Sequence, residues 1–269
     1  MTEASLITTV SLQNTVQQNK SILINKSINP EFSIMDLFKK FQHLPNQTAL
    51  MGVVDEEIPV MFDLRDPGTG SILIINDHLP SIRRLMLTMI RSLTVFNSPQ
   101  DFQYVIISEY PHKWLKLISE FDPEYAFCSG IAGGFEDSTE DWILYLSQRV
   151  EDRINGRGQG PSVILFIEDV AQLEQFDLQV RLNYDWLVKH GARMKIWMVA
   201  GMDMTKGKNE YKLIKEFNTR IFGQMDPVFY SELEGFAPQS ILESLQPNRN
   251  FASKIGSEWI RFWAPKLQG

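Results

Sequence analysis

The chain has 269 residues, 43% of them hydrophobic and 22% charged, which is typical of one globular domain with a small addition and excludes disordered, collagen-like and coiled-coil proteins. Its single cysteine, Cys128, cannot form an internal disulfide, and its four histidines are too scattered for metal-ligand spacing, so we expect no metal site. The formal net charge of −7 argues against a surface built throughout for nucleic-acid phosphates.

The first 45 residues are rich in Thr, Ser, Asn and Gln and contain short apolar patches at residues 21–24 and 34–38. This pattern predicts an N-terminal arm, residues 1–45, that ends in one short helix. Glu3 stands where a signal peptide carries positive charge, and apolar runs such as residues 163–167 are far shorter than the ~20 residues of a membrane helix. We therefore expect a cytoplasmic protein without a membrane-inserted segment.

From residue 46 onward, apolar runs alternate with segments of helical periodicity. The runs are typical of buried strands and occupy residues 59–64, 71–75, 104–107, 162–167, 195–200, 220–225 and 259–263. The predicted helices cover residues 81–93, residues 141–153 and a segment that begins near Leu178, which Gly191 is expected to end in the left-handed conformation. The alternation predicts an α/β domain over residues 46–269, with a mostly parallel sheet and helices on both faces.

Two carboxylates, Glu168 and Asp169, follow the most apolar of these runs. Ligands of doubly wound sheets bind at the carboxyl ends of the strands, so this position is a candidate site. In a Walker B motif, one such acid supports a magnesium ion and the next orients the attacking water. Acidic residues also follow buried strands for a simpler reason, because Asp caps the next helix in a solvated loop. The pattern alone leaves both interpretations open.

Several segments in the same order resemble the FtsK/SpoIIIE and HerA-type ring translocases across residues 46–265. Residues 161–173, with the sequence PSVILFIEDVAQL, are similar to the Walker B strand of that family, and residues 71–90 match its strand, P-loop and helix in length. The resemblance implies a RecA-like P-loop NTPase fold. It also implies a motor that uses Mg-ATP to pump DNA or, in type VII secretion relatives, to act on protein substrates.

The nucleotide loop departs from the family pattern. The positions of the family's three glycines, its lysine and its magnesium-binding hydroxyl fall on Asn76, Leu79, Ser81, Ile82 and Arg83. A working P-loop needs those glycines so that successive N–H groups can surround the phosphates. Leu79 resists positive φ and Pro80 has no N–H, so these residues cannot form an anion nest.

Arginines at the start of the following helix are the remaining phosphate ligands to consider. Arg83 or Arg84 could replace the missing lysine, because arginine binds phosphate well. Alternatively, both are solvated or paired with an acidic neighbour, such as Glu168 or Asp169. Together with Asn76 and Ser81, the two arginines are the candidate nucleotide-binding residues.

The other motifs are altered as well. Glu168 stands where the family has Asp, and Asp169 stands where it has the catalytic Glu, so the reach of each carboxylate changes by about one methylene. After the strand expected to end at Ala200, Gly201 and Met202 replace the polar residue that senses the γ-phosphate. We therefore predict degenerate motifs and no bound cofactor.

These departures predict a pseudo-ATPase that acts as a structural or regulatory module. The resemblance implies protein partners, either further copies of the chain or an active ATPase paralogue, and DNA contact rests on the resemblance alone. The alternative is a divergent but active ATP-dependent DNA translocase in which Glu168 and Asp169 work with Mg-ATP. Either way, we expect strands 71–75 and 162–167 to lie adjacent or one apart, with Asn76 and Glu168 at the same edge of the sheet.

Overall fold

The computed structural model describes residues 31–54, 58–134, 136–206 and 211–267. The apolar patch at residues 21–24 lies outside the described residues, and the boundary expected after residue 45 stays a prediction. The short helix is present as α2 (Ile34–Lys40), where the Ser33 side chain accepts from the N–H of Asp36 and the Asp36 carboxylate accepts from the N–H of Ser33. This reciprocal capping satisfies N–H groups that the first helical turn leaves without partners.

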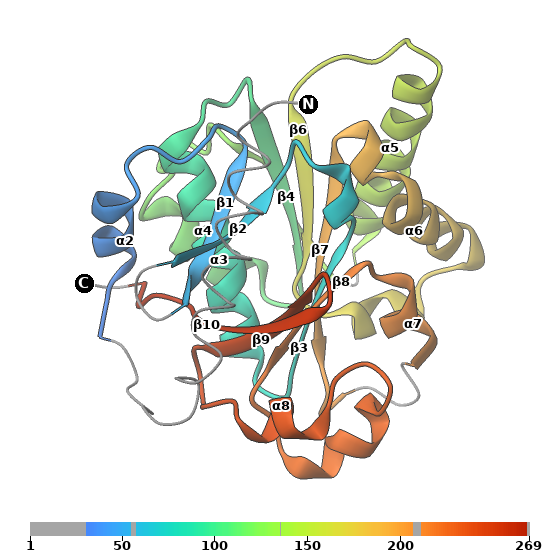
Figure 1. Cartoon of the computed structure of the whole chain (residues 1–269). Coiled ribbons are helices and arrows are strands. Elements are labelled where there is room, and N and C mark those ends of the chain that lie inside the picture. The colour runs from blue at the N-terminus through green and yellow to red at the C-terminus, as the bar shows by residue number, and fades with distance from the viewer. Residues whose placement is uncertain (1–30, 55–57, 135, 207–210, 268–269) are drawn as a thin grey trace. The chain divides into compact units, whose positions relative to one another are not determined.

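One sheet of ten strands forms the centre of the unit that begins at Phe32 (Figure 1). Its order is β2-β1-β10-β9-β8-β3-β7-β6-β4-β5. The parallel part consists of β8 (Thr219–Gly223), β3 (Ile72–Asn76), β7 (Ile196–Asp203), β6 (Ser162–Ile167), β4 (Phe102–Ser108) and β5 (Cys128–Gly133). An antiparallel part extends it through β9 (Asn250–Ile255), β10 (Glu258–Trp263), β1 (Thr48–Val54) and β2 (Ile58–Asp63).

Helices cover both faces of this sheet, as predicted. On one face lie α3 (Leu79–Phe96) and α4 (Pro111–Ser119). On the other lie α5 (Asp137–Ile154), α6 (Leu178–His190), α7 (Tyr211–Glu216) and α8 (Gln239–Glu243). Alternate strand residues serve the two layers, so Ile72 and Ile74 of β3 pack toward α3, whereas Leu73 and Ile75 pack toward α5 and α6. The α/β fold class with a mostly parallel sheet is confirmed.

One helix end differs from the expectation. Gly191 has φ −58° and ψ −47°, which is right-handed, so its predicted left-handed cap is wrong. The chain instead continues through a 3-10 turn, Ala192–Met194, and Lys195 takes the left-handed conformation at φ 58°. Glycine is still required at residue 191, because a Cβ there would lie 2.3 Å from the carbonyl oxygen of Ile196.

Ile82 is the first fully buried apolar residue of α3 and packs the start of the helix against the sheet. We expect Ile82→Lys to lower the free energy of unfolding by about 2–5 kcal/mol, because the ammonium would be buried without a partner. The matched control Ile82→Val removes one methyl group and is expected to cost about 0.5–1.5 kcal/mol. Urea unfolding of both variants measures this, and an unchanged midpoint for Ile82→Lys would contradict the burial of this side chain.

Candidate functional site

The carboxyl ends of β3 and β6 lie at the same edge of the sheet, one strand apart. Strand β7 lies between them and is parallel to both. Asn76 ends β3 beside Asp203 of β7, and Glu168 follows β6 directly. The predicted placement of Asn76 and Glu168 is therefore confirmed.

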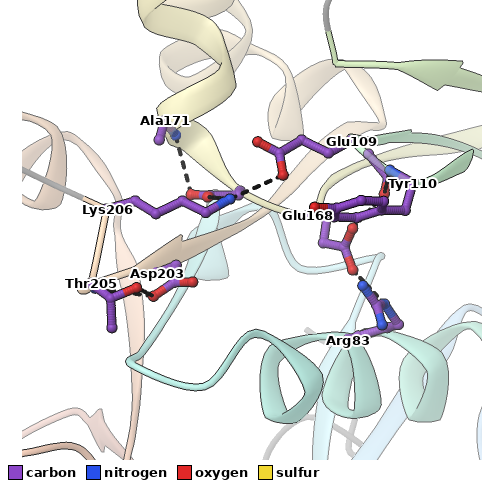
Figure 2. Close-up of polar contacts among 10 residues, drawn as sticks. Arg83, Glu109, Tyr110, Glu168, Ala171, Asp203, Thr205 and Lys206 are labelled. Atoms are coloured by element: carbon purple, nitrogen blue, oxygen red, sulfur yellow. Dashed lines mark hydrogen bonds and ion pairs between the residues drawn. The ribbon is translucent and has the colours of Figure 1, made fainter.

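Glu168 has both carboxylate oxygens occupied although it is completely buried (Figure 2). The Arg83 Nε donates to its Oε1, and the Ser108 hydroxyl donates to its Oε2. The Arg83 side chain is itself only 15% exposed, so the ion pair is largely screened from water. Helix α3 thus supplies the base that neutralises Glu168, which is one of the alternatives expected for Arg83.

Asp169 combines a capping role with a second ion pair. Its Oδ1 accepts from the N–H of Ala171, 3.2 Å away, at the start of the 3-10 helix Val170–Gln175. Lys206 Nζ lies 3.3 Å from its Oδ2 and 3.1 Å from Oε2 of Glu109 (Figure 2). Burial raises the pKa of Asp169, against the opposing effects of the Ala171 N–H and the Lys206 charge. The capping alternative considered for an acid at this position is thus present.

Lys206 connects the loops that follow three neighbouring strands, β4, β6 and β7. Burial works to lower its pKa, but its hydrogen bond to Glu109 and the negative charges of Asp169 and Glu109 outweigh this, so its pKa is raised. Lys206, Ser108 and Glu109 were not among the predicted site residues. Ser108 and Glu109 directly follow the predicted strand 104–107, so the rule that ligands gather at carboxyl ends would have found them.

The loop between β3 and α3 is closed by its own hydrogen bonds. Asn76 Oδ1 accepts from the N–H of His78 at 2.7 Å, and the N–H of Ser81 donates to the carbonyl of His78 at 2.8 Å. The Ser81 hydroxyl lies 2.8 Å from Nδ1 of His78. Among the described residues, those with positive φ all lie outside this loop. The candidates Asn76 and Ser81, at the two ends of the loop, are 2% and 1% exposed, and the side-chain oxygen of each bonds to His78.

Arg84 points elsewhere. Its Nη1 donates to the carbonyl oxygen of Asn248 at 3.2 Å, and burial lowers its pKa. The structure therefore brings Arg83 and Glu168 together and holds Asn76, Ser81 and Asp169 at the same edge, whereas Arg84 is directed toward the loop before β9.

The strand expected to end at Ala200 is three residues longer, which corrects the prediction for Gly201 and Met202. Both lie within β7, which continues to Asp203 because it pairs with β3 as far as Asn76. A Cβ at residue 201 would lie 2.2 Å from the backbone oxygen of Glu168, so glycine allows the two strands to approach. The edge therefore has a polar residue, Asp203, whose Oδ1 accepts from the Thr205 hydroxyl at 2.7 Å.

No group of three or more His, Cys, Asp or Glu side chains in the described ranges is arranged to hold a metal ion. None of the described helices is long and apolar enough to span a membrane.

Breaking the buried ion pair should be costly. We expect Arg83→Met to lower the free energy of unfolding by about 3–5 kcal/mol, because it leaves the Glu168 carboxylate buried without its base. Adding Glu168→Gln to the same chain should recover most of this loss. A double-mutant cycle measured by urea unfolding isolates the coupling between the two residues.

The neighbouring arginine provides the matched control. Arg84→Met removes one hydrogen bond to a carbonyl, so its expected cost is about 1 kcal/mol or less. Equal losses for the two arginine variants, or a coupling energy near zero, would contradict the importance of the ion pair.

The raised pKa of Asp169 predicts a pH dependence. Because the folded state keeps this proton at a pH where the unfolded chain has lost it, the carboxylate destabilises the fold as pH rises through the folded pKa. Asp169→Asn removes the titration, so its free energy of unfolding should rise relative to the parent between about pH 3 and pH 7. Urea unfolding across this range tests the prediction. A relative gain by the parent would show that attraction to Lys206 outweighs burial.

Known proteins resemble this chain in structure but not detectably in sequence. A scan against models of protein families gives no match, and neither does a search of the curated proteins. The cytoplasmic domain of the type VII secretion ATPase EccC from Thermomonospora curvata matches with a TM-score of 0.67 and 13% identity, over 89% of this chain and 32% of that one. EssC (ATPases 2 and 3) from Geobacillus thermodenitrificans matches with a TM-score of 0.66 and 15% identity, over 91% and 49%.

A conjugation protein matches as well. The pCW3 coupling protein TcpA, in a monomer form with ATPγS, gives a TM-score of 0.61 and 16% identity, over 84% of this chain and 67% of that one. The chain thus spans between 32% and 67% of these three proteins' lengths. The fold expected from the sequence is confirmed, and this chain has the fold of FtsK/SpoIIIE-type P-loop ATPase domains.

Proposed function

We propose that this domain is a pseudo-ATPase, a non-hydrolysing structural or regulatory module of a secretion or translocation assembly. The observation that carries the proposal is the buried ion pair between Arg83 and Glu168. By the family resemblance, Glu168 corresponds to an acid that supports magnesium, and Arg83 corresponds to the hydroxyl residue that binds it. In this chain the two side chains bind each other.

The partners of Glu168 do not suit Mg-ATP. A carboxylate that supports a bound magnesium ion needs an oxygen free to accept from its water shell or to bind the ion. Both oxygens of Glu168 instead accept from Arg83 and Ser108. To release them, the protein would have to separate a guanidinium from a carboxylate that is completely buried, and separating such a pair costs several kcal/mol.

The loop offers few donors for phosphate. The N–H groups of His78 and Ser81 already bond to Asn76 and to the carbonyl of His78, and Pro80 has no N–H. Asp77 and Asp203 add negative charge at this edge, which opposes a triphosphate, whereas the charge of Glu109 is paired with Lys206. These contacts support degenerate nucleotide-binding motifs and a domain without a bound cofactor.

The partners we propose are proteins, either further copies of this chain or an active ATPase domain. The matched structures of EccC and EssC each comprise ATPases 2 and 3, and this chain matches 44% and 49% of their lengths. A domain of this fold that does not hydrolyse ATP could serve as a fixed neighbour in such an arrangement. We place it in the cytoplasm. Contact with DNA rests on the family resemblance alone.

One observation favours the alternative of a divergent, active ATP-dependent DNA translocase. Glu168 and Asp169 do lie at the edge where such an enzyme needs its acids, and Lys206 adds a cation beside them. In that case, Lys206 would have to exchange its carboxylate partners for phosphate oxygens.

Nucleotide assays separate the two functions. We expect no ATP hydrolysis above background and no Mg-ATP binding at the carboxyl edge tighter than about millimolar, since a useful site would need several charge-assisted bonds that this edge lacks. Calorimetry and phosphate release measure both quantities in the full chain. Ile82→Lys, which restores the family's lysine, is expected to leave hydrolysis at background because the loop still lacks its N–H donors.

Two results would contradict the proposal. The first is turnover that Glu168→Gln abolishes. The second is micromolar Mg-ATP binding that Glu168→Gln weakens, because only a nucleotide at the carboxyl edge would respond to that change. Either result would establish the alternative of an active ATPase.

A further inference from the structure

Two adjoining cavities lie along α5, and the second reaches the amino edge of the sheet, opposite Glu168. The first, of about 360 Å³, is lined in part by Gln103, Ser129 and Val163, which are the second residues of β4, β5 and β6. The second, of about 410 Å³, lies at the carboxyl end of α5 and the loop after it. Tyr145 and Arg149 line both cavities, so the two meet at these side chains, and together we call them the α5 site.

The second cavity is strongly basic in a chain whose net charge is −7. Arg149, Arg153 and Arg157 line it, with Asp152 as its single acid. Asp152 pairs with Arg157 at 3.3 Å. Arg149 has only the Tyr145 ring, 5.7 Å away, and its hydroxyl, 3.4 Å away, as partners among the described residues. The cavity thus holds more guanidinium charge than its own acid can balance.

Arg153 is held rigidly within this cavity. Its guanidinium donates to the carbonyl oxygens of Met194 at 2.5 Å and Pro161 at 2.7 Å, so it ties the loop after α5 to the start of β7. Burial lowers its pKa, and the nearby positive charge of Arg149 lowers it further. An anion bound in this cavity would offset that repulsion and would leave the hydrogen bonds of Arg153 in place.

The first cavity has a different chemistry. Its walls include the apolar side chains of Val105, Leu146 and Val163 and the aromatic rings of Trp142 and Tyr145. The two rings meet edge to face, with centroids 5.7 Å apart, and Tyr145 is 50% exposed. Such a surface accommodates a flat aromatic ring, and the lining residues Gln103, Ser138 and Asp141 offer polar groups that suit the polar atoms of a base.

We propose that the α5 site binds a nucleotide, with its base in the apolar cavity and its phosphate between Arg149 and Arg157. Guanidinium groups bind phosphate oxygens in pairs, and bases stack on tyrosine rings. An acidic peptide would share the charge of this ligand but would leave the aromatic cavity unused. Neither cavity is lined by Arg83, Glu168 or Ser108, so the site does not rest on the proposed function.

Calorimetry with three probes in magnesium-free buffer tests this site: AMP, pyrophosphate and adenosine. We expect AMP to bind more tightly than either of the other two, because only AMP occupies both cavities. Arg149→Gln should lower the affinity for AMP at least about tenfold, since it removes a charge-assisted contact. Tyr145→Ala should lower the affinity for AMP by about fivefold and keep the affinity for pyrophosphate within about twofold of the parent value.

Arg181→Gln is the matched control, because Arg181 is an exposed arginine of α6 that lines neither cavity. It should leave AMP affinity unchanged, and equal melting temperatures confirm that every variant is folded. The proposal is overturned if AMP does not bind, if Arg149→Gln and Arg181→Gln bind it equally, or if pyrophosphate binds as tightly as AMP.

The same variants keep this site apart from the proposed function. ATP binding that Arg149→Gln removes belongs to the α5 site and supports this inference. ATP binding that survives Arg149→Gln and responds to Glu168→Gln belongs to the carboxyl edge and contradicts the pseudo-ATPase proposal instead.

Discussion

A carboxylate without solvent exposure, Glu168, imposes the main constraint on the centre of this structure. It follows the most apolar strand of the sheet, where an unpaired charge would be prohibitively costly, so a base must reach it. Arg83 does so from the first turns of α3. The position of α3 on the sheet is therefore set by an electrostatic requirement as well as by apolar packing.

The residues around this ion pair are packed closely enough to keep it largely out of water. Ile82, the residue before Arg83, packs close to Gly201. A Cβ at residue 201 would lie 2.5 Å from the Ile82 side chain. The absence of a side chain at residue 201 lets β7 approach both the helix and the backbone of Glu168. The ion pair and the close approach at Gly201 are thus two parts of one arrangement, in which α3, β6 and β7 are in mutual contact.

The parts of the fold that could be predicted from the sequence are those buried on both faces. The strand Ser162–Ile167 reads as an unbroken apolar run because helices cover it on either side. Strands β5 and β9 escaped prediction because Gly, Ser, Asn and Lys interrupt their apolar residues. Gly52 likewise interrupts the apolar residues of β1, and a Cβ at this residue would lie 2.2 Å from the carbonyl oxygen of Trp263. These segments are strands because neighbouring strands pair with them, which the local sequence pattern does not reveal.

The candidate site shows the same division. A pair between the acid after one strand and an arginine near the start of the helix after another strand could be anticipated, because both lie at one edge of a parallel sheet. The contact of Lys206 with this site could not be anticipated, because it depends on where β7 ends. From the sequence alone, Gly201 suggests that the strand stops there. Only the pairing of Asn76 with Asp203 reveals that the strand continues and brings Lys206 to Asp169.

The antiparallel extension of the sheet has a consequence for how the chain folds. Strand β1 joins the sheet only through β10, with Val53 beside Trp263, more than two hundred residues apart in sequence. Contacts of such large sequence separation form late, because the entropy of closing the intervening loop must be lost first. During synthesis on the ribosome, the hairpin of β1 and β2 is made early, and α3 can then pack on it, but β1 has no second strand to pair with until β10 has emerged. Its unpaired backbone edge is exposed for that whole interval, and protection by a chaperone would matter most there.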